Sequence, residues 1–332
     1  MKVRIPISVA FSLLIVGLTG LFPSHAQKAA PQPAPAETSN GAPPLSNPLK
    51  VALLKWYKAN ETTRFAVGNQ PYGICFDGAN IWTANFGDDT VTKLRANDGA
   101  KLGTFPVGVS PYGVTFDGAN IWVSNVGENT VMKLRASDGK NVGTFTVQPG
   151  PGWTAFDGAN IWVPNGQNFV TKLRASDGKN LGNFIVGGGP IAAAFDGANV
   201  WVTSTSDDTV SKVRASDGTL LGTFKVGSGV IGVAFDGANI WTANGGDSTV
   251  SKLRASDGTT LGTFSTGNFP YGVAFDGVYI WVSGAPETTI LRASDGLVVD
   301  HLYKHGAATT GVAFDGANIW VTAYDFNAVE KL

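Results

Sequence analysis

A tryptophan recurs along this chain at intervals of 39 or 40 residues. The seven positions are Trp82, Trp122, Trp162, Trp201, Trp241, Trp281 and Trp320. A period of about 40 residues is typical of repeat folds whose units bury their apolar faces only by packing against neighbouring units. We therefore expect seven copies of one structural unit, and we assign the seven tryptophans to the packing between copies.

Each unit has the pattern of four short strands. In the second unit, residues 111–118, 119–125, 131–135 and 142–147 are rich in β-branched and aromatic residues. Asp117-Gly118 and Asp138-Gly139 supply the positive-φ residues that tight hairpins need. The unit has no helical spacing, which argues against helical repeats of similar period. The pattern predicts an all-β fold, a seven-bladed β-propeller of four-stranded antiparallel blades.

The two ends of the repeat region predict how the ring closes. The last unit, residues 309–332, contains only three strand segments, whereas residues 63–67 match the fourth strand at residues 103–107. We expect this N-terminal strand to complete the last blade. Residues 51–55 also match a third strand, and they are either an extra edge strand or a decayed remnant of one.

The first 49 residues differ in composition from the repeats. Lys2 and Arg4 precede an apolar run and small residues near Ala26, which predicts a signal peptide over residues 1–26. An uncleaved anchor is the alternative. Residues 27–49 are rich in proline and alanine and predict an extended linker. The propeller then covers residues 50–332, and the expected location is the periplasm or the extracellular space.

Charge and cysteine content limit the classes of partner. The formal net charge is −1 and both signs are interspersed, which gives no reason to expect nucleic acid as a partner. Outside the predicted leader, no apolar run approaches the roughly 20 residues that cross a bilayer. Cys75 is the only cysteine, so the chain has no intramolecular disulfide, and we interpret it as a small core residue rather than a nucleophile. We expect a monomer without a membrane span in the mature chain.

Two sets of loops alternate in each unit, and only one set varies. The Asp-Gly hairpins are nearly identical in every unit, so we assign their aspartates to structure, whereas the loops on the opposite face differ in sequence. Variable loops on a rigid scaffold commonly bind ligands. The candidate binding residues of this face are Asn69, Tyr72, Tyr112, Trp153, Asn268, Phe269, Tyr271 and His305. The alternative is that the tyrosines only cap the packing between blades.

Other charged residues have simpler interpretations. Acidic residues of the variable face precede Thr or Ser, where they commonly cap turns, although a ring of carboxylates can also hold Ca²⁺ or Mg²⁺. These residues are Asp88, Asp89, Glu128, Asp207, Asp208, Asp247 and Glu287. Lys93 and Arg95 flank an apolar residue, and we expect them and their copies to form a solvated outer face.

The repeat sequence resembles a known group of propellers. Residues 233–241, Val-Ala-Phe-Asp-Gly-Ala-Asn-Ile-Trp, are similar to the YVTN and NHL-type repeats of bacterial propellers, and especially to the streptogramin (virginiamycin B) lyase group. The resemblance covers about residues 51–332 and is carried by scaffold residues. It implies a seven-bladed propeller, and in the lyases it implies a His and Mg²⁺ held by Glu residues near the axis. His305 is the only histidine in a variable-face loop, no Glu pair matches the metal ligands, and we transfer no catalytic residue from the group.

These observations favour an exported, non-enzymatic propeller that binds a protein, peptide or glycan through its variable face, without a cofactor. One alternative is a metal-dependent C–O lyase or lactonase that acts at the axis and uses Mg²⁺ or Ca²⁺. Another is a structural surface component without a small ligand.

Overall fold

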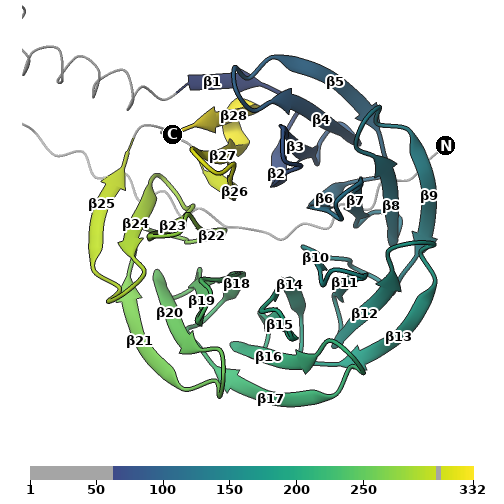
Figure 1. Ribbon diagram of the computed structural model, residues 1–332. Coiled ribbons are helices and arrows are strands. Elements are labelled where there is room, and N and C mark those ends of the chain that lie inside the picture. Colours follow the sequence, from purple (N-terminus) through teal and green to yellow (C-terminus); the bar gives the residue numbers. More distant parts are fainter. Residues whose placement is uncertain (1–62, 304–307) are drawn as a thin grey trace, which may run out of the picture. The chain divides into compact units, whose positions relative to one another are not determined.

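In the computed structural model of the protein, the described residues are 63–303 and 308–332. The predicted leader, the linker, the strand-like residues 51–55 and the candidate residue His305 lie outside the described residues. The described chain forms seven four-stranded antiparallel sheets in a ring (Figure 1). The seven-bladed propeller predicted from the tryptophan spacing is thus confirmed.

The first three blades each consist of four consecutive strands. Blade one contains β2 (Pro71–Phe76), β3 (Asn80–Asn85), β4 (Thr90–Arg95) and β5 (Lys101–Pro106). Blade two contains β6 (Pro111–Phe116), β7 (Asn120–Asn125), β8 (Thr130–Arg135) and β9 (Asn141–Thr146). Blade three contains β10 (Ala155–Phe156), β11 (Asn160–Asn165), β12 (Phe169–Arg174) and β13 (Asn180–Ile185).

Blades four to six repeat this order. Blade four contains β14 (Pro190–Phe195), β15 (Asn199–Ser204), β16 (Thr209–Arg214) and β17 (Leu220–Lys225). Blade five contains β18 (Val230–Phe235), β19 (Asn239–Asn244), β20 (Thr249–Arg254) and β21 (Thr260–Ser265). Blade six contains β22 (Val273–Phe275), β23 (Tyr279–Val282), β24 (Thr288–Arg292) and β25 (Val298–Leu302). In each blade the first strand lies nearest the centre and the fourth at the rim (Figure 1).

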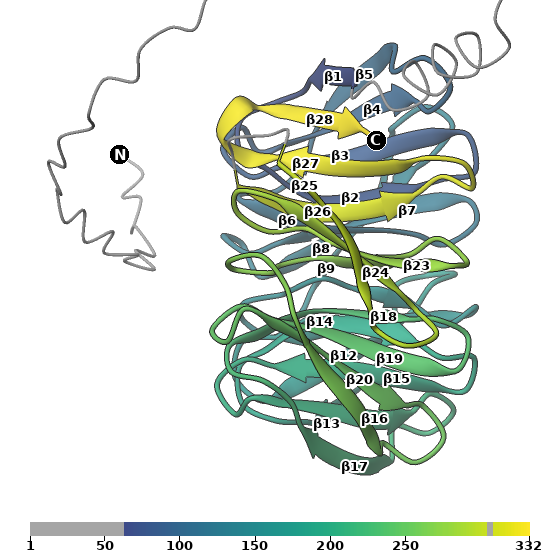
Figure 2. The ribbon, with the colours of Figure 1, turned by 90° about the vertical axis from the view of Figure 1, so that its left-hand side faces the viewer.

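Blade seven joins strands from far apart in the sequence. Its strands are β26 (Thr309–Phe314), β27 (Ile319–Ala323), β28 (Ala328–Lys331) and β1 (Thr63–Ala66), with a short 3₁₀ turn η1 (Tyr324–Phe326) before β28. Strand β1 runs antiparallel to β28, and Arg64 Nε donates a 2.6 Å hydrogen bond to Glu330 Oε1. Figure 2 shows these strands side by side at the edge of the ring. The predicted closure by an N-terminal strand is confirmed.

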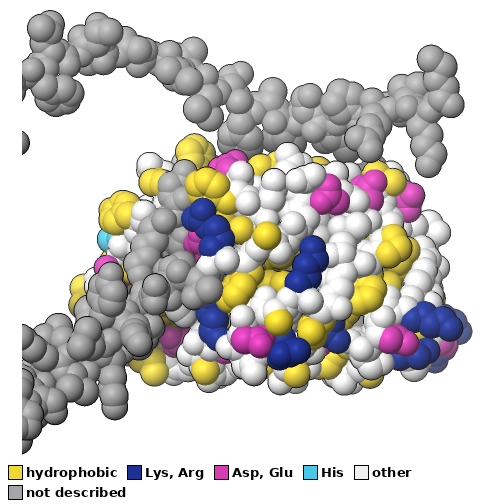
Figure 3. Space-filling view, turned by 90° about the horizontal axis from the view of Figure 1, so that it is seen from above, with side chains coloured by type: hydrophobic (Ala, Val, Ile, Leu, Met, Phe, Trp, Pro, Cys, Tyr) yellow, Lys and Arg dark blue, Asp and Glu magenta, His cyan; other side chains and the backbone are white. Residues whose placement is uncertain are grey.

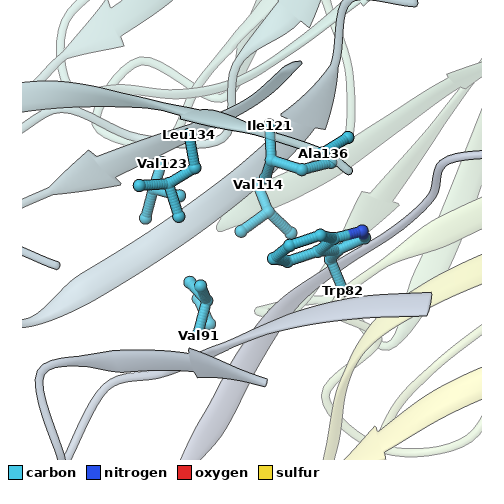
Figure 4. Packing of buried hydrophobic residues seen from close by; sticks show 8 residues of the cluster. Trp82, Val91, Val114, Ile121, Val123, Leu134 and Ala136 are labelled. Carbon is cyan, nitrogen blue, oxygen red and sulfur yellow. The ribbon is translucent and has the colours of Figure 1, made fainter. Parts of the chain in front are cut away.

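The core lies between neighbouring blades. Trp82 and Val91 of blade one pack against Val114, Ile121 and other apolar residues of blade two (Figure 4). Six of the seven repeated tryptophans are 0% exposed, and each of these six packs in a cluster of this kind. Each blade therefore supplies an indole that its neighbour covers, which is why a single unit cannot bury its own core.

The outer surface is mixed in character. The fourth strands alternate exposed and half-buried residues, and Leu102 and Val142 are each 44% exposed. Where described residues are visible in Figure 3, hydrophobic, basic and acidic side chains are interspersed among neutral polar ones. Within residues 63–303 and 308–332, no helix has the length and apolar character that crossing a bilayer requires.

Candidate functional site

The repeated hairpins of one face tie each blade to its own tryptophan. Asp117 Oδ2 accepts a 2.7 Å hydrogen bond from Trp122 Nε1, and Asp117 Oδ1 accepts the backbone N–H groups of Ala119 and Asn120 at 2.9 and 2.6 Å. Burial alone would raise the pKa of this carboxyl group, but the hydrogen bonds outweigh burial and lower the pKa below its ordinary value. The same Asp–Trp bond is present in all seven blades. These aspartate carboxylates therefore stabilise the hairpins and hold the tryptophans of the blades.

The lysines of the third strands are buried, so the predicted solvated face is wrong for them. Lys93 is 7% exposed, its Nζ donates a 2.7 Å hydrogen bond to the backbone oxygen of Ala136 in the next blade, and it lies 5.0 Å from the Trp82 ring centre. Arg95 is exposed and pairs with Asp98. Because side chains alternate between the two faces of a strand, Lys93 and Arg95 lie on the same face of the sheet. Only the lysine side chain is enclosed between two blades.

The variable face carries an aromatic cluster at the axis, which we define by Tyr72, Tyr112, Trp153 and Tyr271. The ring centres lie 4.8 Å apart for Tyr72 and Tyr112, 5.6 Å for Tyr112 and Trp153, and 5.3 Å for Trp153 and Tyr271. All four side chains are partly exposed. The structure thus brings together four of the eight candidate binding residues, from blades one, two, three and six.

Hydroxyl groups link the cluster across the axis. The Tyr112 and Tyr271 oxygens are 2.7 Å apart and share a hydrogen bond, although the residues are 159 positions apart in the sequence. Burial raises the pKa of both phenols well above the ordinary value, and it does the same for Tyr72. The three phenols therefore stay neutral at physiological pH and remain hydrogen-bond donors.

Two further aromatic residues border the cluster, and the sequence interpretation did not include them. The Tyr72 ring centre lies 5.4 Å from that of Phe86 and 5.2 Å from that of Tyr324. Both residues directly follow the second strand of a blade, β3 in blade one and β27 in blade seven. Their shared position after that strand is a signal that could have identified them.

Trp153 joins the cluster because the inner strand of blade three is displaced. Its backbone N–H donates a 2.8 Å hydrogen bond to the Ile191 oxygen of blade four, and its own oxygen accepts one of 3.1 Å from Ala193. The indole Nε1 donates to the Tyr112 oxygen at 3.3 Å. At Gly152 a Cβ would collide with the Ile191 carbonyl group, so only glycine permits this close approach of the two blades. The order Gly152-Trp153 in place of Tyr-Gly therefore directs an indole toward the axis.

A cavity of about 140 Å³ lies on the axis beneath the cluster, and Trp153 forms part of its wall. Every blade contributes to the wall, and one aligned position of the repeat lines it in all seven blades. The residues at this position are Ile74, Val114, Thr154, Ala193, Val233, Val273 and Val312. The space is close to the volume that holds a benzene-sized molecule in a protein interior.

Blades four and five do not contribute aromatic side chains to the cluster at the equivalent positions. Ile191 and Ile231 take the place that tyrosine has in blades one, two and six. The loops before them contain Gly189 and Gly229, which have left-handed φ values of 65° and 62°. Beyond these loops, Thr205 holds the position that Phe86 has in blade one. The aromatic residues therefore lie on one side of the axis, and aliphatic and small residues lie on the other side.

The other described candidate residues are exposed loop residues of the variable face. Asn69 is exposed, and its backbone N–H and its Nδ2 donate 2.6 Å hydrogen bonds to the two carboxylate oxygens of Asp88. Asn268 is exposed, and its backbone oxygen accepts the Ala285 N–H at 3.0 Å. Phe269 is 57% exposed and has a left-handed φ of 48°. Asn69, Asn268 and Phe269 thus belong to the loops that precede the inner strands of blades one and six.

Acidic residues of the variable face bind backbone groups of neighbouring loops. Asp89 Oδ1 accepts the Ser110 N–H at 2.9 Å, and Asp208 Oδ1 accepts the Gly229 N–H at 2.7 Å. No group of three or more His, Cys, Asp or Glu side chains that could hold a metal ion lies within residues 63–303 and 308–332. The residues present in this part of the chain therefore do not fit the Mg²⁺ site that the lyase resemblance implies.

Blade six brings together titratable side chains whose contact the sequence did not predict. His301 Nδ1 lies 3.1 Å from Glu287 Oε1 and 3.3 Å from Thr289 Oγ1, and a hydrogen bond to Glu287 raises the pKa of Tyr303. A catalytic triad needs one imidazole nitrogen for the nucleophile and the other for the carboxylate. Because the same nitrogen makes both contacts, this group does not have the geometry of a triad.

Cys75 lies within the scaffold. It is half-buried and packs against the apolar cluster between blades one and two. Burial raises the pKa of its thiol far above the ordinary value, with a smaller contribution from Asp77. The thiol therefore stays protonated at neutral pH, which is the opposite of what a nucleophilic cysteine needs.

Comparison with known proteins supports the fold. No family model matches the sequence, and no curated protein matches it. A streptogramin B lyase structure is 16% identical, with a TM-score of 0.71, over 82% of this chain and 96% of that one. A catalytically inactive virginiamycin B lyase from Staphylococcus aureus with quinupristin is 18% identical, with a TM-score of 0.70, over 82% and 98%. Hydrazine synthase from Kuenenia stuttgartiensis is 16% identical, with a TM-score of 0.70, over 81% and 96%. The chain thus shares the propeller fold of the streptogramin lyases.

Proposed function

We propose that this chain is a non-enzymatic binding propeller, and that it holds a protein, peptide or glycan ligand at the axial aromatic cluster of its variable face. The observation that carries this proposal is the convergence of Tyr72, Tyr112, Trp153 and Tyr271 from four blades onto one partly exposed patch. The predicted leader supports a role in the periplasm or outside the cell.

The cluster offers two kinds of contact to a ligand. Aromatic faces stack on sugar rings, on other aromatic groups and on peptide planes, and the neutral phenols add hydrogen-bond donors. Because the rings pack on one another, with Tyr112 and Trp153 inclined by only 20°, they lose little conformational freedom on binding. A ligand that stacks on these aromatic rings would extend over the aliphatic side chains of Ile191 and Ile231.

The charged residues nearby support binding rather than catalysis. The carboxylates of Asp88, Asp89 and Asp208 accept backbone N–H groups, and these contacts fix the loops that surround the cluster. The imidazole of His301 lies on β25, a rim strand, with its Nδ1 engaged. These side chains act as supports for a preformed surface.

The test is to screen the mature protein against glycan and peptide arrays and to measure the affinity of each hit for matched variants. Trp153→Ala should weaken binding by about tenfold or more, because stacking on an aromatic side chain is worth about 1–3 kcal/mol in comparable sites. The control is Phe326→Ala, which removes a 45% exposed aromatic side chain that lies outside the cluster. Equal affinities for the two variants would contradict the proposal.

A second candidate function is a lyase or lactonase that opens a cyclic depsipeptide at the axis with a metal ion. The likeness to a virginiamycin B lyase crystallised with quinupristin favours it. Incubation of the protein with quinupristin, followed by mass spectrometry, tests this alternative directly. Linear product that disappears after chelation would support it, and intact quinupristin after long incubation with Mg²⁺ would remove it.

A further inference from the structure

Cations of this protein lie over aromatic rings outside the axial cluster. On the variable face, the Arg64 guanidinium lies 4.2 Å from the ring centre of Phe326. Between blades, the Nζ atoms of six lysines lie 5.0 to 5.3 Å from tryptophan ring centres, as Lys93 lies 5.0 Å from Trp82. In the part of the chain that the structure describes, none of these cations lies over a ring of the axial cluster. The partly exposed, electron-rich rings of the cluster are therefore available to a cation from another molecule.

The loops that border the cluster are acidic. Phe86 and Tyr324, which contact Tyr72, belong to loops between the second and third strands of their blades. Five loops of this kind have an exposed carboxylate, and these residues are Asp88, Glu128, Asp207, Asp247 and Asp325. The described loops of the variable face contain no lysine or arginine, and Lys304 lies outside the described residues. In the remaining described residues, lysine and arginine slightly outnumber aspartate and glutamate. The negative charge is thus concentrated on the face that carries the cluster.

We propose that the axial cluster binds an arginine-rich peptide segment of a partner protein, with one guanidinium stacked on the aromatic rings. This inference rests on the binding function proposed above and names the class of its ligand. A guanidinium is planar and weakly hydrated, so it stacks on aromatic faces at a smaller desolvation cost than an ammonium group. The exposed carboxylates come from five blades, so a ligand that meets several of them carries several cations. A basic chain segment has that property, whereas a neutral glycan makes no use of the charge.

Fluorescence anisotropy with labelled peptides tests the class of ligand. The probe is an Arg-Gly-Arg-Gly-Arg peptide, and the matched control has citrulline at each arginine position, which keeps the shape of the side chain and removes its charge. We expect the arginine peptide to bind at least about tenfold more tightly at low salt and to lose most of this advantage at high salt. Equal affinities of the two peptides, or no binding of the arginine peptide at low salt, would overturn the proposal.

A pair of double variants tests whether the acidic loops attract the arginine peptide. Asp207→Asn combined with Asp247→Asn should weaken its binding by about threefold or more, and asparagine keeps an oxygen that can accept the loop N–H groups bound by these carboxylates. The matched control is Asp217→Asn combined with Asp257→Asn, which removes the same charge from hairpins of the opposite face and should leave the affinity unchanged. Equal weakening by the two double variants would overturn the proposal, because the peptide would then respond only to the overall charge.

The Trp153→Ala variant separates this proposal from the function on which it rests. It should weaken binding of the arginine peptide by about fivefold or more, because the guanidinium loses a ring face. A neutral glycan or peptide whose binding depends on Trp153 and not on the acidic loops would overturn the basic ligand and leave the binding function in place. Arrays that contain no ligand dependent on Trp153 would overturn both.

Discussion

The replacement of Lys133 by Met tests whether the buried lysines hold the ring together. The side chain is 9% exposed, its Nζ lies 2.7 Å from the Ala175 oxygen and 3.4 Å from the Ser176 oxygen, and it sits 5.1 Å from the Trp122 ring centre. Methionine keeps the length and apolar stem of lysine and removes only the charge and the hydrogen bonds. The variant therefore isolates the polar part of one seam.

The expected loss combines three effects. A hydrogen bond from a charged group contributes about 1.5–3 kcal/mol, and a desolvated cation–π contact contributes about 2 kcal/mol. Methionine avoids the cost of desolvating an ammonium group, which is several kcal/mol for a fully buried ion and smaller for one that keeps a residual exposure. The contacts outweigh this gain at Lys133, because the ammonium group meets two backbone oxygens and an indole face. We expect Lys133→Met to lower the free energy of unfolding by about 1–3 kcal/mol.

Urea unfolding followed by far-ultraviolet circular dichroism measures this loss as a lower transition midpoint. The control is Arg135→Met, which removes a cation two residues away that is half-exposed and pairs with Asp138 at 3.1 Å. Exposed ion pairs contribute about 0–1 kcal/mol, so this variant should stay near the wild type. A Lys133→Met protein as stable as the wild type, or more stable, would show that the desolvation cost dominates and would refute the reasoning.

Three further predictions concern packing, pH and the aromatic cluster. Gly152→Ala should destabilise the protein by about 1–3 kcal/mol in urea unfolding, because the added Cβ meets a backbone carbonyl group of the next blade. The control Gly166→Ala should be close to neutral, because the nearest atom to its added Cβ is 3.5 Å away. Asp117 has a lowered pKa, so the stability that it contributes is present at neutral pH and is lost as the pH falls below about 4; Asp117→Asn should weaken the protein at pH 7 and flatten the fall in melting temperature on acidification. Tyr112→Phe and Tyr271→Phe should each cost about 0.5–1.5 kcal/mol, and the double variant should cost little more than either single one, because both remove the same hydrogen bond.

The sequence contains most of the information about the fold. Trp82 and its copies give the period, the Asp-Gly pairs give the hairpins, and the match of residues 63–67 to a fourth strand predicts the closure that β1 and β28 form. These features are local or strictly periodic, so they can be identified without coordinates. The burial of Lys93 was not predicted, because alternation along one strand does not reveal that a hairpin of the next blade covers it.

The candidate site was predictable only in part. Tyr72, Tyr112 and Tyr271 occupy one position of the repeat, so their placement on one face follows from the periodicity. Their mutual contact does not follow, because it depends on the radius of the ring and on the rotamers that direct each ring inward. Trp153 reaches the cluster through a local displacement of its strand, and Phe86 enters from a loop position that is aromatic only in blades one and seven.

The pairing of β1 with β28 makes the order of synthesis matter for this protein. Arg64 and Glu330 are 266 positions apart, so β1, the first strand of the described residues, must wait for nearly the whole repeat region before its partner exists. Until β28 is made, β1 has no partner strand in the seventh sheet, and its unpaired edge is open to any other extended segment. A chain interrupted before residue 328 could fold six sheets and still present that edge. The protein therefore depends on complete translation more strictly than an open array of the same repeats would.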